Sequence, residues 1–133
     1  MLEPFEVSVS RRHGEITILV SGELDIAAEP QLQPILDRAI REAEWGLRVV
    51  LDLQALTFCD STGLRLLVTA QRLAAKRSVQ FGIVPPTGAA WAAVEICGLQ
   101  DVLPFVPSAG DRHLHAVPDE TDMPEAGLGV GAA

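Results

Sequence analysis

The chain has 133 residues, of which 48% are hydrophobic, and its formal net charge is -8 at pH 7. This length and apolar content fit one globular domain with a sizeable core, and the acidic balance argues against nucleic acid or an anionic membrane as the main partner. The N-terminal segment carries Glu3 and Glu6 and no long apolar run, unlike a signal peptide. No apolar stretch reaches the roughly 20 residues that span a bilayer, so we expect a cytoplasmic protein.

The chain begins with a predicted β-hairpin. Residues 5–10 alternate apolar and polar side chains, which is typical of an edge strand. Residues 11–14 are predicted as the turn, and residues 15–20, which are rich in β-branched side chains, as the second strand. We expect the chain to leave the sheet at the next segment, Gly22-Glu23-Leu24-Asp25.

A first amphipathic helix is predicted after this segment. Its apolar side chains recur at the spacing of one helix face, at Leu32, Ile35, Leu36, Ala39 and Ile40. Pro30 suits a first helical turn. Pro34 lacks an N–H group and crowds the preceding turn, so we expect the helix either to start near Gln33 or to be kinked. Gly46 can end it.

A buried strand and a second helix form the predicted centre of the chain. Residues 47–53 are apolar on both faces apart from Arg48 and Asp52, as in a parallel sheet covered by helices. The segment Asp60-Ser61-Thr62 has the residue types of a helix start, and the apolar run 64–75 predicts a helix that is buried over most of its circumference. A serine hydroxyl is therefore expected at a helix N-terminus, near the carboxyl end of a core strand.

The rest of the chain completes a predicted α/β domain. Residues 79–84 are predicted as a strand, 87–97 as an alanine-rich helix and 103–106 as a last short strand. Residues 111–116 fit one or two helical turns, whereas residues 117–133 are acidic and rich in Pro and Gly and are expected to be disordered. The order β-β-α-β-α-β-α-β predicts one domain over residues 1–116, with a mixed, mostly parallel sheet flanked by helices.

Cysteines and histidines do not indicate a metal site. Cys59 and Cys97 lack the spacing of metal ligands, and we interpret them as two small core thiols in a reducing compartment. His113 and His115 form an isolated H-x-H pair, a pattern that seldom binds metal by itself. The sequence has no glycine-rich phosphate-binding motif, and we expect no cofactor. Trp91 is interpreted as core or rim packing.

Two motifs in this order resemble the STAS domain family, which includes the anti-sigma factor antagonists and a domain of sulfate transporters. The first motif is Gly22-Glu23-Leu24-Asp25. The second is Phe58-Cys59-Asp60-Ser61-Thr62-Gly63-Leu64, which follows the apolar segment Val50-Leu51-Asp52-Leu53. The resemblance runs from about residue 5 to residue 106 and implies a sheet of four or five strands wound with its helices as a β-α superhelix.

The resemblance to the bacterial antagonists implies a phosphorylation switch. The regulatory serine of that family corresponds to Ser61 in this chain. A partner that is both anti-sigma factor and serine kinase would phosphorylate it, and a serine phosphatase would reset it. The unphosphorylated antagonist sequesters that partner and frees a sigma factor for transcription. The partner-binding residues implied here are Glu23, Asp25, Asp60, Ser61, Thr62, Gly63 and Arg65.

Electrostatics is consistent with such a switch. Free N–H groups and the positive end of the helix dipole favour a phosphate at a helix N-terminus, so the modification should not unfold the domain. The phosphate adds about -1.5 to -2 charge, and a docked partner would desolvate it at a cost on the order of several kcal/mol. We expect the missing Cβ of Gly63 to let a partner backbone approach.

Plainer explanations compete with this interpretation. Residues 60–63 fit an ordinary helix cap, and Asp25 and Asp52 fit turn or cap hydrogen bonding. Thr62 carries a second hydroxyl that a kinase could phosphorylate, although the more common role of such a threonine is solvation of the first helical turn. The prolines of the first helix and the loss of the family's final helix depart from the commonest pattern, which puts the identity of the partner in question.

Other classes of protein fit this sequence less well than a switch. An enzyme is disfavoured because Ser61 lacks a G-x-S-x-G elbow and a histidine positioned as its base. A receiver phosphorylated on Asp52 is disfavoured because the only lysine, Lys76, ends a predicted helix. A STAS scaffold subunit of a membrane transporter or of a stress-signalling complex stays open as the alternative. Whether the chain forms a weak homodimer also stays open.

Overall fold

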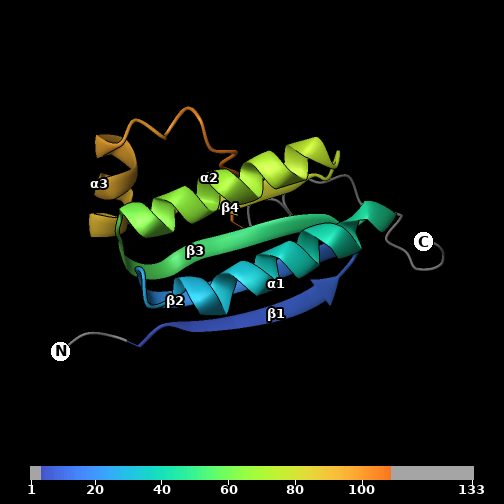
Figure 1. Ribbon diagram of the computed structural model, residues 1–133, viewed down its shortest axis with the longest axis horizontal. Helices are drawn as coiled ribbons and strands as arrows, with labels where there is room; N and C mark the ends of the chain where they lie inside the picture. Colours follow the sequence, from blue (N-terminus) through green and yellow to red (C-terminus); the bar gives the residue numbers. More distant parts are fainter. Residues whose placement is uncertain (1–3, 109–133) are drawn as a thin grey trace.

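The computed structural model describes residues 4–108, which form a sheet flanked by helices (Figure 1). Within these residues the sheet has four strands in the order β1-β2-β3-β4. The strands β1 (Glu6–Arg12) and β2 (Glu15–Leu24) form an antiparallel hairpin. The strands β3 (Arg48–Cys59) and β4 (Phe81–Val84) join in parallel. The predicted mixed, mostly parallel sheet is confirmed.

Two helices cover one face of this sheet (Figure 1). They are α1 (Glu29–Glu42) and α2 (Ser61–Lys76), and they pack against each other. A third helix, α3 (Gly88–Ile96), lies at the end of the sheet where α2 begins. The chain therefore returns to each new parallel strand through a helix, which is the connection that parallel strands require.

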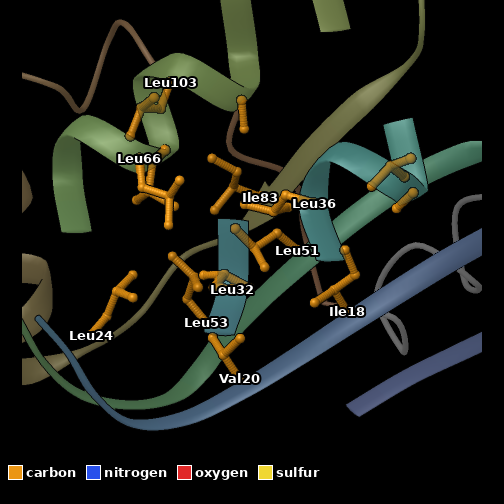
Figure 2. Close-up of a cluster of buried hydrophobic side chains, with 14 of the residues drawn as sticks. Ile18, Val20, Leu24, Leu32, Leu36, Leu51, Leu53, Leu66, Ile83 and Leu103 are labelled. Carbon is orange, nitrogen blue, oxygen red and sulfur yellow. The ribbon is translucent and has the colours of Figure 1, made fainter. Parts of the chain in front are cut away.

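The core lies between the sheet and helices α1 and α2 (Figure 2). Alternate residues of β2 and β3 point into it, because successive side chains of a strand face opposite sides of the sheet. Ile18 and Leu51, which are paired in register, are both fully buried. Leu32 from α1 and Leu66 from α2 are buried in the same cluster. Each such side chain contributes about 1.5–3 kcal/mol when it is buried.

Both central strands are longer than the sequence predicts. β2 continues to Leu24, so the segment 22–25 leaves the sheet only at its last residue. β3 continues from the predicted end at Leu53 as far as Cys59. Register shifts between the two strands interrupt the alternation. From the predicted end onward, the buried residues of β3 are Leu53, Leu56 and Cys59, three positions apart. The extension therefore lacks the period of two by which strands are recognised.

The first helix starts earlier than expected and contains Pro34. α1 begins at Glu29, so a start near Gln33 is wrong. Pro34 is exposed within the helix, where it cannot donate the usual hydrogen bond to the carbonyl of Pro30. The helix passes into a 3-10 turn, η1 (Ala43–Trp45), which ends at Gly46 as predicted.

The end of the described chain differs from prediction in two respects. Residues 103–106 do not form a strand; their contact with the sheet is a single parallel bridge between Phe105 and Ile83. Cys97 is exposed, so the interpretation of both cysteines as core thiols holds only for Cys59. Trp91 packs edge-on against Phe105 with ring centroids 5.2 Å apart, which agrees with a packing role. The predicted turns at 111–116, the pair His113 and His115 and the tail at 117–133 lie outside the described residues.

Candidate functional site

The site begins with Asp60, the N-cap of α2. Its backbone is extended, and its Oδ1 accepts a hydrogen bond of 3.0 Å from the backbone N–H of Gly63. The Asp60 N–H donates to the carbonyl of Leu24 at 3.2 Å, which ties the end of β3 to the end of β2. Asp60 therefore satisfies one of the free N–H groups of the helix start and fixes where the helix begins.

The Ser61 side chain is free of this capping role. Ser61 is the first residue of α2 and is exposed. Because Asp60 already accepts the N–H of Gly63, the serine hydroxyl is not needed as a cap, and no residue between 4 and 108 hydrogen-bonds to it. The hydroxyl is thus open to solvent at a helix N-terminus, where a negative group is favoured.

The end of β2 places Glu23 and Asp25 at the same edge of the sheet. Glu23 is paired in register with Phe58, and Leu24 with Cys59, immediately before the start of α2. Asp25 then turns the chain towards α1, and its Oδ1 accepts the N–H groups of Ala27 at 3.0 Å and Ala28 at 3.2 Å. Asp25 therefore has the turn-forming role that was weighed against partner binding.

Gly63 has a different role from the one expected. It is buried, and a Cβ built on it would lie 2.7 Å from the Leu24 carbonyl oxygen and 2.8 Å from the Cys59 Sγ. The missing side chain therefore admits the protein's own β2 and β3, and a partner backbone is not what occupies this space. Glycine at this position lets the first turn of α2 pack closely against the ends of the two strands.

The residues Thr62 and Arg65 complete the predicted set. Thr62 is half-buried in the first turn of α2. Arg65 is exposed, and among residues 4–108 it forms no ion pair. Arg65 stands four positions after Ser61 on the same helix, a spacing that places two side chains next to each other.

A buried thiol lies beneath the site. Burial raises the pKa of Cys59 from 9.0 to about 12, and the charges of Asp60 and Cys97 act in the same direction. Its Sγ contacts the carbonyl of Asp60 at 3.6 Å. Cys59 is therefore a neutral packing residue below α2 at physiological pH, and thiolate chemistry is not expected of it.

Sequence reasoning missed two apolar residues at this edge. Ile26, in the turn after Asp25, is 69% exposed, and Phe58, which pairs with Glu23, is 43% exposed. An open groove of about 310 Å³ at the end of β2 is lined by Glu23 and Asp25 together with Pro4, Phe5, Ala27, Ala28 and Gln31. An isoleucine directly after the turn residue Asp25 was the available signal for Ile26. Phe58 gave no signal, since it falls in the part of β3 without regular alternation.

The described residues offer no site for a metal ion. Between residues 4 and 108, no group of three or more His, Cys, Asp and Glu side chains is arranged to hold one. None of the helices in this part of the chain has the length and hydrophobicity that crossing a bilayer requires.

The comparison with protein families identifies the domain. A family model described as "Mlab, STAS domain" matches residues 7–106. The chain belongs to the STAS domain family. The resemblance predicted from the two sequence motifs is thereby confirmed. Both motifs lie inside the matched range, at the ends of β2 and β3.

Relatives of this STAS domain include anti-sigma factor antagonists. It is 27% identical over 88 residues to an anti-sigma-B factor antagonist of Listeria monocytogenes, and the alignment covers 66% of this chain and 75% of that protein. The crystal structure of an anti-sigma factor antagonist from Mycobacterium paratuberculosis is similar, with a TM-score of 0.71 and 25% identity over 84% of this chain and 93% of that one. Unphosphorylated SpoIIAA, another such antagonist, has a TM-score of 0.63 at 21% identity, covers 86% of this chain and 99% of its own, and shares the fold.

Proposed function

We propose that this STAS domain is an anti-sigma factor antagonist that is switched by phosphorylation of Ser61. Unphosphorylated, it binds an anti-sigma factor that is also a serine kinase, and so frees a sigma factor for transcription. Phosphorylation of Ser61 by that kinase ends the binding, and a serine phosphatase restores it. The domain itself carries out no catalysis, uses no cofactor and acts in the cytoplasm.

The observation that carries the proposal is the free hydroxyl of Ser61. It is exposed at the first position of α2. Asp60 caps the helix, so the Ser61 side chain is not engaged as a cap. A kinase can therefore reach the hydroxyl without unfolding the helix. This supports a regulatory role over the plain capping role, because capping at this helix is already provided.

The surroundings of Ser61 support docking of a protein partner. The exposed Ile26 and Phe58 supply apolar area at the same edge, next to the carboxylates of Glu23 and Asp25. An apolar centre with a charged rim is the usual composition of a protein interface. We include Ile26 and Phe58 in the partner-binding surface, together with Glu23, Asp25, Asp60, Ser61, Thr62 and Arg65.

The first experiment is phosphopeptide mass spectrometry on the protein from its native cell. We expect one phosphate on Ser61, which Ser61→Ala removes and Thr62→Ala leaves in place. The threonine variant is the matched control because it removes the adjacent hydroxyl of the same helical turn. Phosphate on Thr62 alone, or none in any growth state, would rule out the proposed switch.

The second measurement tests charge as the cause of release. The cognate kinase is isolated by co-purification with Ser61→Ala, and its affinity is compared for Ser61→Gln and Ser61→Glu, which differ in charge but hardly in size. We expect Ser61→Glu to bind at least tenfold more weakly than Ser61→Gln, a difference of about 1.4 kcal/mol. Equal affinities would show that charge exclusion is the wrong mechanism. Equal urea midpoints of the two variants serve as the folding control.

A scaffold role is the second candidate function. The matching family model is described as "Mlab, STAS domain", which does not specify an antagonist, so a STAS subunit of a transporter or stress-signalling complex is kept as the alternative. Co-purification distinguishes the two functions. A scaffold would bring down large assembly partners whose binding is the same for Ser61→Gln and Ser61→Glu.

A further inference from the structure

We infer that Arg65 binds the phosphate of phosphorylated Ser61 within the same chain, so that the phosphorylated form is held by an intramolecular clamp. This inference rests on the proposed function, because it concerns the modified form of Ser61. It assigns Arg65 a role in the switch beyond contact with a partner.

The spacing of the two residues on α2 supports the clamp. Ser61 is the first residue of the helix and Arg65 the fifth, so their Cβ atoms lie about 5–6 Å apart. Side chains of a helix lean towards its N-terminus, so that of Arg65 extends over the turn that contains Ser61. The order is also the favourable one, since an acidic group four positions before a basic one pairs better than the reverse.

The Arg65 guanidinium is available for this role. Four arginines in residues 4–108 form ion pairs with glutamates: Arg11, Arg38, Arg48 and Arg77. Arg65 forms none with any residue of that part of the chain and is exposed. Forming the clamp therefore breaks no existing ion pair, and a guanidinium can donate two parallel hydrogen bonds to phosphate oxygens.

The local negative charge favours such a cation. A phosphate on Ser61 follows directly after the carboxylate of Asp60, and Glu23 and Asp25 lie at the same edge of the sheet. The Gly63 N–H, one of the helix donors that a phosphate could use, is already bonded to Asp60. Arg65 is the basic residue within the first two turns of α2. Its positive charge therefore offsets the negative charge that a phosphate adds beside Asp60.

The test measures the ionisation of phosphoserine itself. Phosphoserine is installed at position 61 of the full chain during translation, and its second pKa is followed by ³¹P NMR from pH 4.5 to 8 in about 0.1 M salt. A nearby guanidinium favours the dianion and lowers this pKa from its ordinary value of about 6. We expect Arg65→Gln to raise it by about 0.3 pH unit or more relative to the parent, the size expected for an exposed i, i+4 ion pair.

Arg72→Gln is the matched control. Arg72 is exposed on the same helix and forms no ion pair with residues 4–108. It stands eleven residues from Ser61, about 16 Å along the axis and beyond the Debye length of about 10 Å at this salt concentration. The clamp predicts an unchanged phosphoserine pKa for Arg72→Gln. Equal pKa values in the parent, Arg65→Gln and Arg72→Gln would overturn it.

A second readout follows the lifetime of the phosphate. A serine phosphatase of broad specificity should remove it at least twofold faster from Arg65→Gln than from Arg72→Gln, because the clamp shields the phosphate oxygens. Equal rates for the two variants would likewise refute the clamp. Because the phosphoserine is incorporated during translation, a negative result for the clamp says nothing about whether Ser61 is phosphorylated in the native cell. The mass spectrometry under "Proposed function" tests that phosphorylation separately.

Discussion

The close contact at Gly63 joins the start of α2, where Ser61 lies, to the core. Its hydrogen-bonded N–H and missing Cβ fix the first turn of α2 over Leu24 and Cys59, two residues from the exposed Ser61. The Ser61 hydroxyl is therefore held on a rigid support, and a partner of the proposed switch would meet a preformed surface. At this site Gly63 packs against the core, whereas Ser61 faces the solvent.

Replacing Gly63 by alanine should destabilise the domain. Alanine gains about 1 kcal/mol in helix propensity, but its Cβ would lie 2.7 Å from a backbone carbonyl oxygen, which cannot move aside cheaply. Overpacking of this kind costs about 1–3 kcal/mol, and we expect a net loss in urea denaturation. Thr69→Ala, at an exposed position of the same helix, should change the free energy of unfolding by less than about 0.5 kcal/mol. A Gly63→Ala variant more stable than the parent would contradict the close packing.

The buried thiol of Cys59 predicts how stability depends on alkaline pH. Its pKa is raised from 9.0 to about 12 by burial in the folded state, so above pH 9 the folded form keeps a proton that the unfolded form loses. The stabilising contribution is therefore complete below pH 9 and decreases as the pH rises towards 12. The chain has no tyrosine and a single lysine, Lys76, so few other groups titrate in this range.

Urea denaturation from pH 7 to 10.5 tests this dependence. We expect the unfolding midpoint of the parent to fall above pH 9, and that of Cys59→Ala to fall less. Alkylation at pH 8 provides an independent check, because exposed Cys97 should react in the native protein and Cys59 only after unfolding. Rapid modification of both thiols in the native state would show that Cys59 is not buried as described.

Among the elements, α1 shows how tertiary packing overrides a local signal. Pro34 argued for a later helix start, yet the helix runs from Glu29 through it. Leu32 and Leu36, on either side of the proline, are fully buried under the helix. Burial of two leucines contributes about 3–6 kcal/mol, which is at least as large as the cost of about 3 kcal/mol for a proline in a helix. The apolar face therefore decides where the helix lies.

Replacing Pro34 by alanine should stabilise the domain. The change restores an N–H that can bond to the carbonyl of Pro30, and removing proline regains about 3 kcal/mol of helix propensity. The greater freedom of the unfolded chain offsets about 1 kcal/mol of this gain. We expect a net increase of about 1–2 kcal/mol by urea denaturation.

Pro30→Ala is the control for this substitution. Pro30 is the second residue of α1, where an N–H has no acceptor within the helix. Its replacement should give no comparable increase. If Pro34→Ala were no more stable than Pro30→Ala, the missing hydrogen bond would not be a source of instability in α1.

In the whole domain, the two ends of the parallel strands differ in the residues that they carry. Parallel strands β2 and β3 finish at the same edge, which brings the turn after β2 and the start of α2 together (Figure 1). At the opposite edge, where these strands begin, Glu15 pairs with Arg48 at 3.1 Å and Glu44 with Arg77. Trp45, in η1, is 89% exposed on this side. Exposed ion pairs contribute little to stability, whereas the other edge carries the proposed switch.

Much of the domain was predictable from local patterns. Period-two alternation and β-branched side chains predicted the hairpin, and the positions of apolar residues predicted α1 and α2. The residue types at 60–62 predicted where α2 starts. Together with the segment 22–25, the second motif gave the family and the candidate serine. These features are predictable because hydrogen bonding and side-chain facing repeat over a few residues, and a cap needs only its own turn.

Contacts between distant segments decided the rest. The chain alone did not reveal that β3 continues to Cys59, that Gly63 is required by packing against Leu24, or that Phe58 and Ile26 are both exposed. Each of these depends on β2 and β3 being side by side with shifted register, a relationship between residues about 35 positions apart. Short-range periodicity carries no information about such pairings, so burial and exposure at the site were settled only when the strands were assembled.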